Sequence, residues 1–257
     1  MFNFLDKMRF VCRLASEVLE YVEFYVKPGV STGELDSLCH NYIVNNQNAI
    51  PASLGYHGFP KSVCISVNEV VCHGIPSNKK RLKNGDIVNI DVAIIKDGCY
   101  GDTSKMFFVG SPSILSKRLC KVSQNSLYLA IYMVRPGLHI KELGKSIQKF
   151  VELENFSVVR EYCGHGIGKN FHEDPHVLHY ESDDFDCILN EGMIFTIEPM
   201  VNVGTCFVRV MKDGWTVKTK DHGFSAQYEH TVLVTKYGCE IMTLRSDEKI
   251  SKIINHF

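Results

Sequence analysis

The sequence lacks a strong charge of either sign. Its 257 residues include 28 lysines and arginines against 29 aspartates and glutamates, which gives a formal net charge of −1. A protein that binds nucleic acid or an anionic membrane usually carries a basic surface, and no basic excess is present here. We therefore expect neither a nucleic acid nor a membrane as partner.

Long hydrophobic runs and targeting signals are also missing. The longest uninterrupted apolar run, residues 127–134, is far shorter than the roughly 20 residues that cross a bilayer. Residues 1–24 carry acidic side chains at helical spacing and resemble neither a signal peptide nor a transit peptide. These features predict a cytoplasmic protein.

Closely spaced cysteine pairs are absent, although the chain has ten cysteines. No two of them show the C-x2-C or C-x4-C spacing of structural zinc sites. Because no secretory signal is present, we expect reduced, buried thiols rather than disulfides.

A hairpin with two acidic side chains is predicted over residues 87–109. Asp97-Gly98 is a strong two-residue turn signal between β-rich runs. If these residues form the turn, the pairing places Asp102 diagonal to Asp91 on one face, about 7–8 Å apart. A single Asp would fit an exposed polar face equally well, but two convergent ones favour a cation site.

Helical and strand patterns alternate through the rest of the chain. Apolar stripes and caps predict helices at residues 4–26, 31–46, 114–134 and 141–154. Further strands are expected at residues 62–67, 158–162, 193–200 and 226–235, with a second hairpin around residues 213–214.

The chain also contains an internal repeat. Three pairs of segments match in the same order: VKPGVSTGEL (26–35) with VRPGLHIKEL (134–143), CHGI (72–75) with GHGI (164–167), and LKNGDIVNID (82–91) with LNEGMIFTIE (189–198). Chance similarity of turn signals is the alternative. The simplest explanation is one domain over residues 1–257, built from two similar α/β halves, about 1–110 and 111–257, that face each other across a cleft.

The repeat pairs the acidic residues and two histidines. It matches Asp91 with Glu198, Asp102 approximately with Glu229, and His73 with His165. Four buried carboxylates cannot all stay ionised without compensating charge, and two divalent cations would cancel them. One imidazole beside four carboxylates suits Mn, Fe, Co or Zn better than Ca or Mg. The alternative for the histidine of GHGI is a loop residue bonded to backbone.

Two other motifs do not fit their usual structures. HEDPH (172–176) matches the H-E-x-x-H pattern of helical zinc proteases, but Pro175 would break that helix. GHGIGK (164–169) lacks the glycine spacing and the Ser/Thr of a phosphate-binding loop, and it also misses G-x-G-x-x-G.

Several long motifs resemble those of a known family. NIDVAIIKDGCYGDTSKMF, GHGIGKNFHEDPHVLHY, GMIFTIEPM, SAQYEHTVLVT and LGYHGFPKSVCISVNEVVCHGIP resemble the type I methionine aminopeptidases, over roughly residues 4–245. The resemblance implies a pita-bread fold, an α/β (α+β) architecture in which helices cover a central antiparallel sheet of two pseudo-symmetric halves. It also implies an enzyme, a methionyl aminopeptidase that uses two divalent metal ions.

The resemblance assigns roles to the matching residues. Asp91 would chelate one metal ion, Asp102 and Glu229 would bridge both ions, and His165 and Glu198 would complete the other. The catalytic set would be His73, His172 and Glu198. The methionine pocket, which the two histidines border, would comprise Ser53, Tyr56, Phe59, Cys64, Phe171 and Trp215. Family members often carry Cys at position 53 and Tyr at position 59, so this pocket departs from the family pattern.

The implied activity is removal of the initiator methionine from nascent polypeptides. A metal-bridging hydroxide would attack the first peptide bond, with Glu198 as the general base. The expected setting is a cytoplasmic monomer that meets nascent N-termini near the ribosome. Two alternatives remain, namely another aminopeptidase or dipeptidase of the same superfamily and a non-catalytic peptide- or ribosome-binding protein on the same fold.

Overall fold

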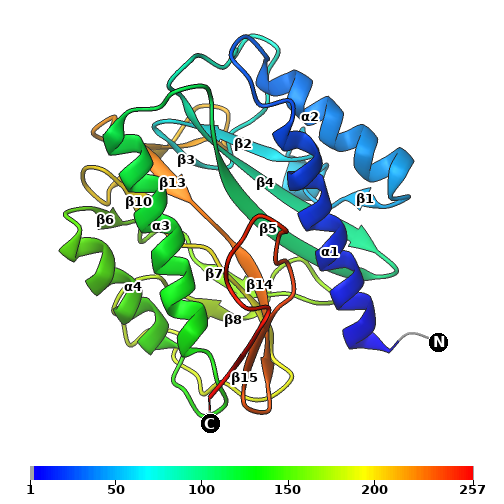
Figure 1. The fold of residues 1–257 in the computed structure, drawn as a ribbon, viewed down its shortest axis with the longest axis vertical. Coiled ribbons are helices and arrows are strands. Elements are labelled where there is room, and N and C mark those ends of the chain that lie inside the picture. The colour runs from blue at the N-terminus through cyan, green and yellow to red at the C-terminus, as the bar shows by residue number, and fades with distance from the viewer. Residues whose placement is uncertain (1–2, 257) are drawn as a thin grey trace.

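The computed structural model describes residues 3–256, in which four α-helices pack on antiparallel sheets (Figure 1). The helices are α1 (Phe4–Glu23), α2 (Thr32–Asn41), α3 (Ile114–Met133) and α4 (Lys141–Leu153). Ser31 and Glu34 form the expected capping box of α2, and a π-helical turn, Tyr42–Asn46, continues that helix. All four helices therefore lie where the sequence predicts them.

Within the described residues the strands form four sheets, of six, four, three and three strands. Their bounds are β1 (Ile50–Pro51), β2 (Cys64–Val67), β3 (Val70–Cys72), β4 (Ile87–Lys96), β5 (Cys99–Phe108), β6 (Ser157–Val158), β7 (Gly164–Gly166), β8 (Glu173–Val177), β9 (Ile194–Ile197), β10 (Met200–Asn202), β11 (Val208–Val210), β12 (Val217–Thr219), β13 (Ser225–Gln227), β14 (His230–Thr235), β15 (Gly238–Ile241) and β16 (Ile253–Asn255). The largest sheet has the order β16-β15-β14-β9-β7-β8, and β4 pairs with β1, β2 and β5 in a second sheet.

The β4–β5 hairpin has the register that its turn predicts. Lys96 lies opposite Cys99, and Ala93 lies opposite Asp102. One face of β4 is packed into the core beneath α1 through Val88, Ile90, Val92 and Ile94. Because side chains alternate along a strand, Asp91 points to the other face, together with Ala93 and its partner Asp102.

The two halves repeat each other in backbone hydrogen bonds as well as in sequence. The N–H of Gly29, after α1, donates to the carbonyl of Leu82 at 2.8 Å, and the N–H of Gly137, after α3, donates to the carbonyl of Leu189 at 2.8 Å. The next turns repeat the relation, with Gly85 donating to Val109 and Gly192 to Val234. Each half also has its own apolar core, one under α1 and α2 and one under α3 and α4.

Three strand predictions need correction. The segment 193–200 is two strands, β9 and β10, interrupted at Glu198-Pro199, and the segment 226–235 is likewise divided into β13 and β14. The second interruption contains Glu229, whose N–H donates to the carbonyl of Ser104 on β5 and so joins the two halves. The expected strand at 158–162 is reduced to β6, because only its first residues find a partner, in β10.

A C-terminal segment, residues 243–248, fastens the two halves together; we call it the strap. It lies between α1 and α3, in red in front of β5 and β14 in Figure 1. The buried guanidinium of Arg245 donates to the hydroxyl of Thr103 on β5 at 2.8 Å and to Glu248 at 3.0 Å. His230 on β14 and Tyr128 on α3 also contact the carboxylate of Glu248.

Within the described residues, no helix is long and apolar enough to cross a membrane.

Replacing Glu248 with Gln should destabilise the protein by about 3–5 kcal/mol, because Arg245 would keep a buried charge without its partner. Burial alone would raise the pKa of Glu248, but His230, Arg245 and Tyr128 hold it well below its ordinary value. The stabilisation is therefore complete above the unfolded pKa of about 4.3 and is lost as the pH falls below it.

Urea unfolding of wild-type and Glu248→Gln protein between pH 3 and pH 7 measures both effects. Asp247→Asn is the matched control, since Asp247 is half exposed and its partner Lys105 keeps a second carboxylate, that of Glu23. A difference between wild type and Glu248→Gln that stays constant down to pH 3 would contradict this account.

Candidate functional site

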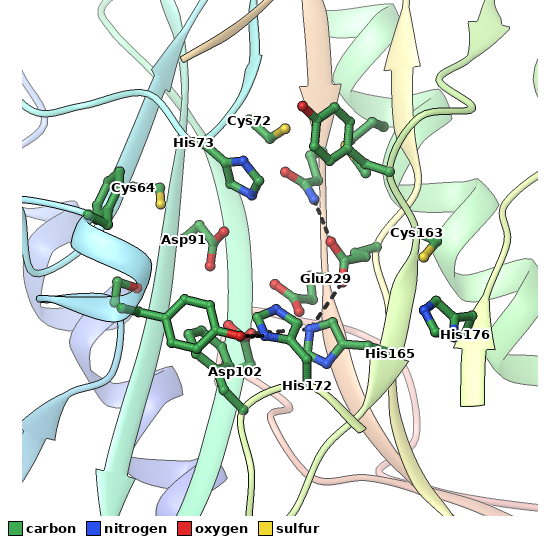
Figure 2. Close-up of a pocket in the computed structure, with 18 of the residues that line it drawn as sticks. Cys64, Cys72, His73, Asp91, Asp102, Cys163, His165, His172, His176 and Glu229 are labelled. Carbon is green, nitrogen blue, oxygen red and sulfur yellow. Dashed lines mark hydrogen bonds and ion pairs between the residues drawn. The ribbon is translucent and has the colours of Figure 1, made fainter. Parts of the chain in front are cut away.

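A cleft of about 730 Å³ lies between the two halves, and all of the sequence-predicted site residues line it. Figure 2 shows the acidic and histidine side chains pointing into this space from both sides. Asp91 and Asp102 come from β4 and β5 of the first half. His165 comes from β7, and Glu198 and Glu229 come from the interruptions after β9 and before β14.

The predicted metal ligands converge at the floor of the cleft. One ligand atom each of Asp102, His165 and Glu229 lies within 4.8 Å of the others. The Nε2 atom of His165 is 3.7 Å from a carboxylate oxygen of Asp102 and 3.7 Å from one of Glu198. The hairpin and the repeat thus bring together five side chains that are far apart in the sequence, from Asp91 to Glu229.

The four carboxylates are held in a medium that disfavours their charge. Burial raises the pKa of Asp91 to about 6 and that of Glu198 to about 8. Burial together with the neighbouring carboxylates raises the pKa values of Asp102 and Glu229 well above the ordinary range. The described residues place no lysine or arginine in the lining of the cleft. Without a cation these groups are neutralised by protonation, so ionisation of all four would require positive charge from a bound cation.

The donor set fits a divalent transition metal. Oδ1 of Asp102 is buried and has no hydrogen-bond partner within residues 3–256, although its acceptor capacity demands one. The Nδ1–H of His165 donates to the carbonyl of Gly166 at 3.0 Å, so the Nε2 lone pair faces the carboxylates. Burial also lowers the pKa of His165 to about 4, which keeps this imidazole neutral and able to bind a metal.

The glycines on either side of His165 permit close backbone packing. A Cβ atom on Gly164 would lie 2.3 Å from the carbonyl oxygen of Thr196, and one on Gly166 would lie 2.0 Å from that of Asp174. Both distances are impossible for a side chain. The two glycines therefore let β7 lie tightly between its neighbours, which fixes the imidazole at the cleft floor.

Three residues that support Glu198 are absent from the sequence-based site. The hydroxyl of Thr196 donates to Oε1 of Glu198 at 2.8 Å, and the amide of Gln227 donates to Oε2 at 3.1 Å. The fully buried His179 accepts the backbone N–H of Glu198 at 3.1 Å. Period-two alternation could have indicated Thr196, but nothing in the apolar run around His179 marks it.

An aromatic pocket borders the metal ligands. The rings of Phe59 and Trp215 meet edge to face, with centroids 5.2 Å apart, and those of Tyr56 and Phe171 do so at 4.9 Å. Ser53 and Cys64 complete this wall.

Two further histidines face the cleft. His73 follows β3 with a positive φ of 53°, an unusual conformation for a residue other than glycine, and its ring contacts Trp215. The ring of His172 lies 4.2 Å from that of His165, and its Nδ1 is hydrogen-bonded to the hydroxyl of Tyr56. Burial lowers the pKa values of both, that of His172 to about 3, so both are neutral at pH 7.

The fold and the site define a metallopeptidase. Residues 6–236 match metallopeptidase family M24, and the chain belongs to that family. It is 66% identical to the methionine aminopeptidase of Escherichia coli K12, over 98% of this chain and 96% of that one. It is 61% identical to the methionine aminopeptidase of a Buchnera aphidicola strain from Acyrthosiphon pisum, over the same shares of the two chains.

Solved structures extend the similarity to the fold. The crystal structure of methionine aminopeptidase from Rickettsia prowazekii matches with a TM-score of 0.91 at 51% identity, covering 95% of this chain and all of that one. The enzyme from Thermotoga maritima matches at 0.90 and 36% identity, covering 95% of this chain and 99% of that one. A prolidase from Pyrococcus horikoshii shares only the fold, with a TM-score of 0.74 at 22% identity over 96% of this chain and 63% of that one. The predicted pita-bread fold is confirmed.

The raised pKa values predict how pH affects the metal-stripped protein. A carboxylate whose pKa is higher in the folded state stabilises the fold below its unfolded pKa, and this contribution is lost as the pH rises through the folded value. Stability without metal should therefore fall between about pH 4, the ordinary pKa of these groups, and pH 8, which Glu198 reaches on folding. Thermal unfolding with a chelator and with excess Mn²⁺ measures this.

Metal should remove most of this loss, because it binds the ionised ligands and so stabilises the fold more strongly at higher pH. Asp91→Asn is the matched variant, since it removes one titrating group and should flatten the curve measured with chelator. Parallel pH profiles with and without metal would show that the carboxylates do not form the ion site.

Proposed function

We propose that this chain is a metal-dependent aminopeptidase that removes the N-terminal methionine from polypeptides. The observation that carries the proposal is a cluster of four carboxylates and one neutral imidazole beside an aromatic pocket, in a cleft between two similar halves. Full-length relatives that are methionine aminopeptidases support it. The finer proposal is that the substrates are nascent chains, met near the ribosome by a cytoplasmic monomer.

Two divalent ions of Mn, Fe, Co or Zn type would balance the site. Two such ions carry four positive charges, which equals the charge of four ionised carboxylates. Asp91 would chelate one ion, Asp102 and Glu229 would bridge, and His165 and Glu198 would complete the other. When bound, such ions lower the pKa of a coordinated water toward about 7 and supply a nucleophile for the peptide carbonyl.

Glu198 is the proposed proton carrier. A carboxylate beside the peptide carbonyl can take up a proton from the attacking water and release it again, as general acid–base catalysis requires. Thr196 and Gln227 hold one carboxylate oxygen each, so the group keeps one orientation while it accepts a proton and passes it to the leaving amine. A free α-amine, with a pKa near 8, can be neutral and bind beside Asp91, which restricts cleavage to N-termini.

The aromatic pocket supports methionine as the first residue. Tyr56, Phe59, Phe171 and Trp215 offer ring edges and faces to an unbranched thioether, and sulfur–aromatic contacts contribute about 0.3–1.5 kcal/mol. Ser53 and Phe59, which stand where relatives of this kind often have Cys and Tyr, alter the polarity of this wall without touching the acidic cluster.

Extensive chelation should abolish cleavage, and one suitable metal added back should restore it. Asp102→Ala should also be inactive while remaining folded, because a bridging position is lost. The assay compares Met-Ala-X, Met-Arg-X, Leu-Ala-X and X-Pro peptides, with Met-Ala-X expected to be fastest. Preference for Leu-Ala-X or X-Pro would instead indicate another activity of the superfamily, and no cleavage of any peptide with metal present would indicate a binding protein.

His73→Ala and His172→Ala should each lower kcat at least tenfold and leave metal content and melting temperature unchanged. Both histidines are neutral imidazoles at the cleft, and losing one donor to a developing oxyanion typically costs about 10²–10³ in kcat. Metal analysis, thermal unfolding and steady-state kinetics separate the possibilities. Loss of metal would make the residue a ligand, and unchanged kcat would make it structural.

A further inference from the structure

His165 and His172 lie side by side in the cleft but have opposite hydrogen-bond partners. Their ring centroids are 4.2 Å apart. The Nδ1 of His165 faces a backbone carbonyl, that of Gly166, at 3.0 Å. The Nδ1 of His172 faces a phenol hydroxyl, that of Tyr56, at 2.7 Å, drawn as a dashed line at His172 in Figure 2.

These partners decide which nitrogen of each neutral ring carries the proton. A carbonyl can only accept, so His165 must hold its proton on Nδ1, and its Nε2 presents a lone pair to the acidic cluster. A phenol always has a proton to donate below its pKa, and burial raises the pKa of Tyr56 above its ordinary value of 10. Among residues 3–256 this hydroxyl has no other protein partner. With Tyr56 as the donor to Nδ1 of His172, the single proton of the neutral ring lies on Nε2.

We propose that Tyr56 is a positioning residue that fixes His172 in the Nε2–H form, so that this ring donates a hydrogen bond into the cleft instead of binding metal. The hydrogen-bond partner of Nδ1 distinguishes the two rings. Nε2 of His165 is left with a lone pair that can bind metal, whereas Nε2 of His172 carries a proton that it can donate. The bond also crosses the cleft, because Tyr56 belongs to the short 3-10 helix Tyr56–Gly58 of the first half and His172 precedes β8 of the second.

The hydroxyl of Tyr56 and its ring have separate roles: the hydroxyl orients His172, and the ring forms part of the pocket wall. A phenylalanine would keep the edge-to-face contact with Phe171 at 4.9 Å and the wall of the pocket. It would remove only the hydroxyl that orients His172. Which nitrogen of His172 carries the proton does not depend on the proposed function. The expected effect of Tyr56→Phe on kcat does rest on the proposed function.

The direct test is ¹⁵N NMR of the histidine rings in metal-stripped wild type and Tyr56→Phe protein near neutral pH. The His172 signals are assigned by their loss in His172→Ala. Wild type should show His172 in the Nε2–H form and His165 in the Nδ1–H form. In Tyr56→Phe, His172 should become a mixture of both forms while His165 stays unchanged. His172 in the Nδ1–H form in wild type, or an unaltered His172 in Tyr56→Phe, would overturn the proposal.

Kinetics give a second readout. Tyr56→Phe should lower kcat about tenfold or more, with KM for Met-Ala-X within about twofold and metal content unchanged, since one oriented donor is lost and the pocket wall remains. Tyr100→Phe is the control, because the ring of Tyr100 stacks on Phe171 with centroids 5.7 Å apart but has no part in the His172 hydrogen bond. It should match wild type in both measurements.

The two experiments keep this inference separate from the proposed function. If the rings behave as expected but wild type cleaves no peptide, the proposed function is wrong and the inference about Tyr56 stands. If wild type cleaves Met-Ala-X and kcat is the same in Tyr56→Phe, the positioning role is wrong and the proposed function stands.

Discussion

Four carboxylates that share one buried floor are the constraint on which the rest of the structure depends. Each resists ionisation because of burial, and Asp102 and Glu229 also feel their acidic neighbours. Such a cluster is favourable only if cations bind it, so the chain must hold the four groups close together and keep its own positive side chains out. The duplicated fold does this by bringing two acidic residues from each half to the seam between β5 and β14.

The residues behind the cluster keep this arrangement rigid. Thr103, next to Asp102, donates to the backbone carbonyl of Glu229 at 2.7 Å and accepts from Arg245. Thr231 donates to the backbone carbonyl of Asp102 at 2.7 Å. The two central acids are thus tied to each other through backbone, and the strap holds them from the face that carries the helices. Because a metal site needs its ligands placed closely, these outer contacts matter as much as the ligands.

The sequence predicts much of this architecture, for local reasons. Asp97-Gly98 fixes the turn, and the turn fixes which residues of β4 and β5 share a face. The repeat locates the second pair of acids, because duplicated turns place duplicated strands. Pro199, which cannot donate to a strand ladder, marks the interruption at Glu198 in the sequence. Nothing similar marks the interruption at Glu229, where the strand pattern is ordinary and only the contact with Ser104 of the opposite half shows why pairing stops. The Arg245–Glu248 pair escapes notice because the residues that contact it, Thr103, Tyr128 and His230, are distant or unmarked in the sequence.

We propose the acidic floor as a site for two ions per chain. Isothermal titration calorimetry of metal-stripped protein with Mn²⁺ at pH 7.5, with metal content checked after removal of free ion, tests it most directly. We expect saturation at two ions per chain, with proton release on binding because the carboxylates have raised pKa values. Saturation at one ion in fully active protein, or binding without proton release, would contradict it.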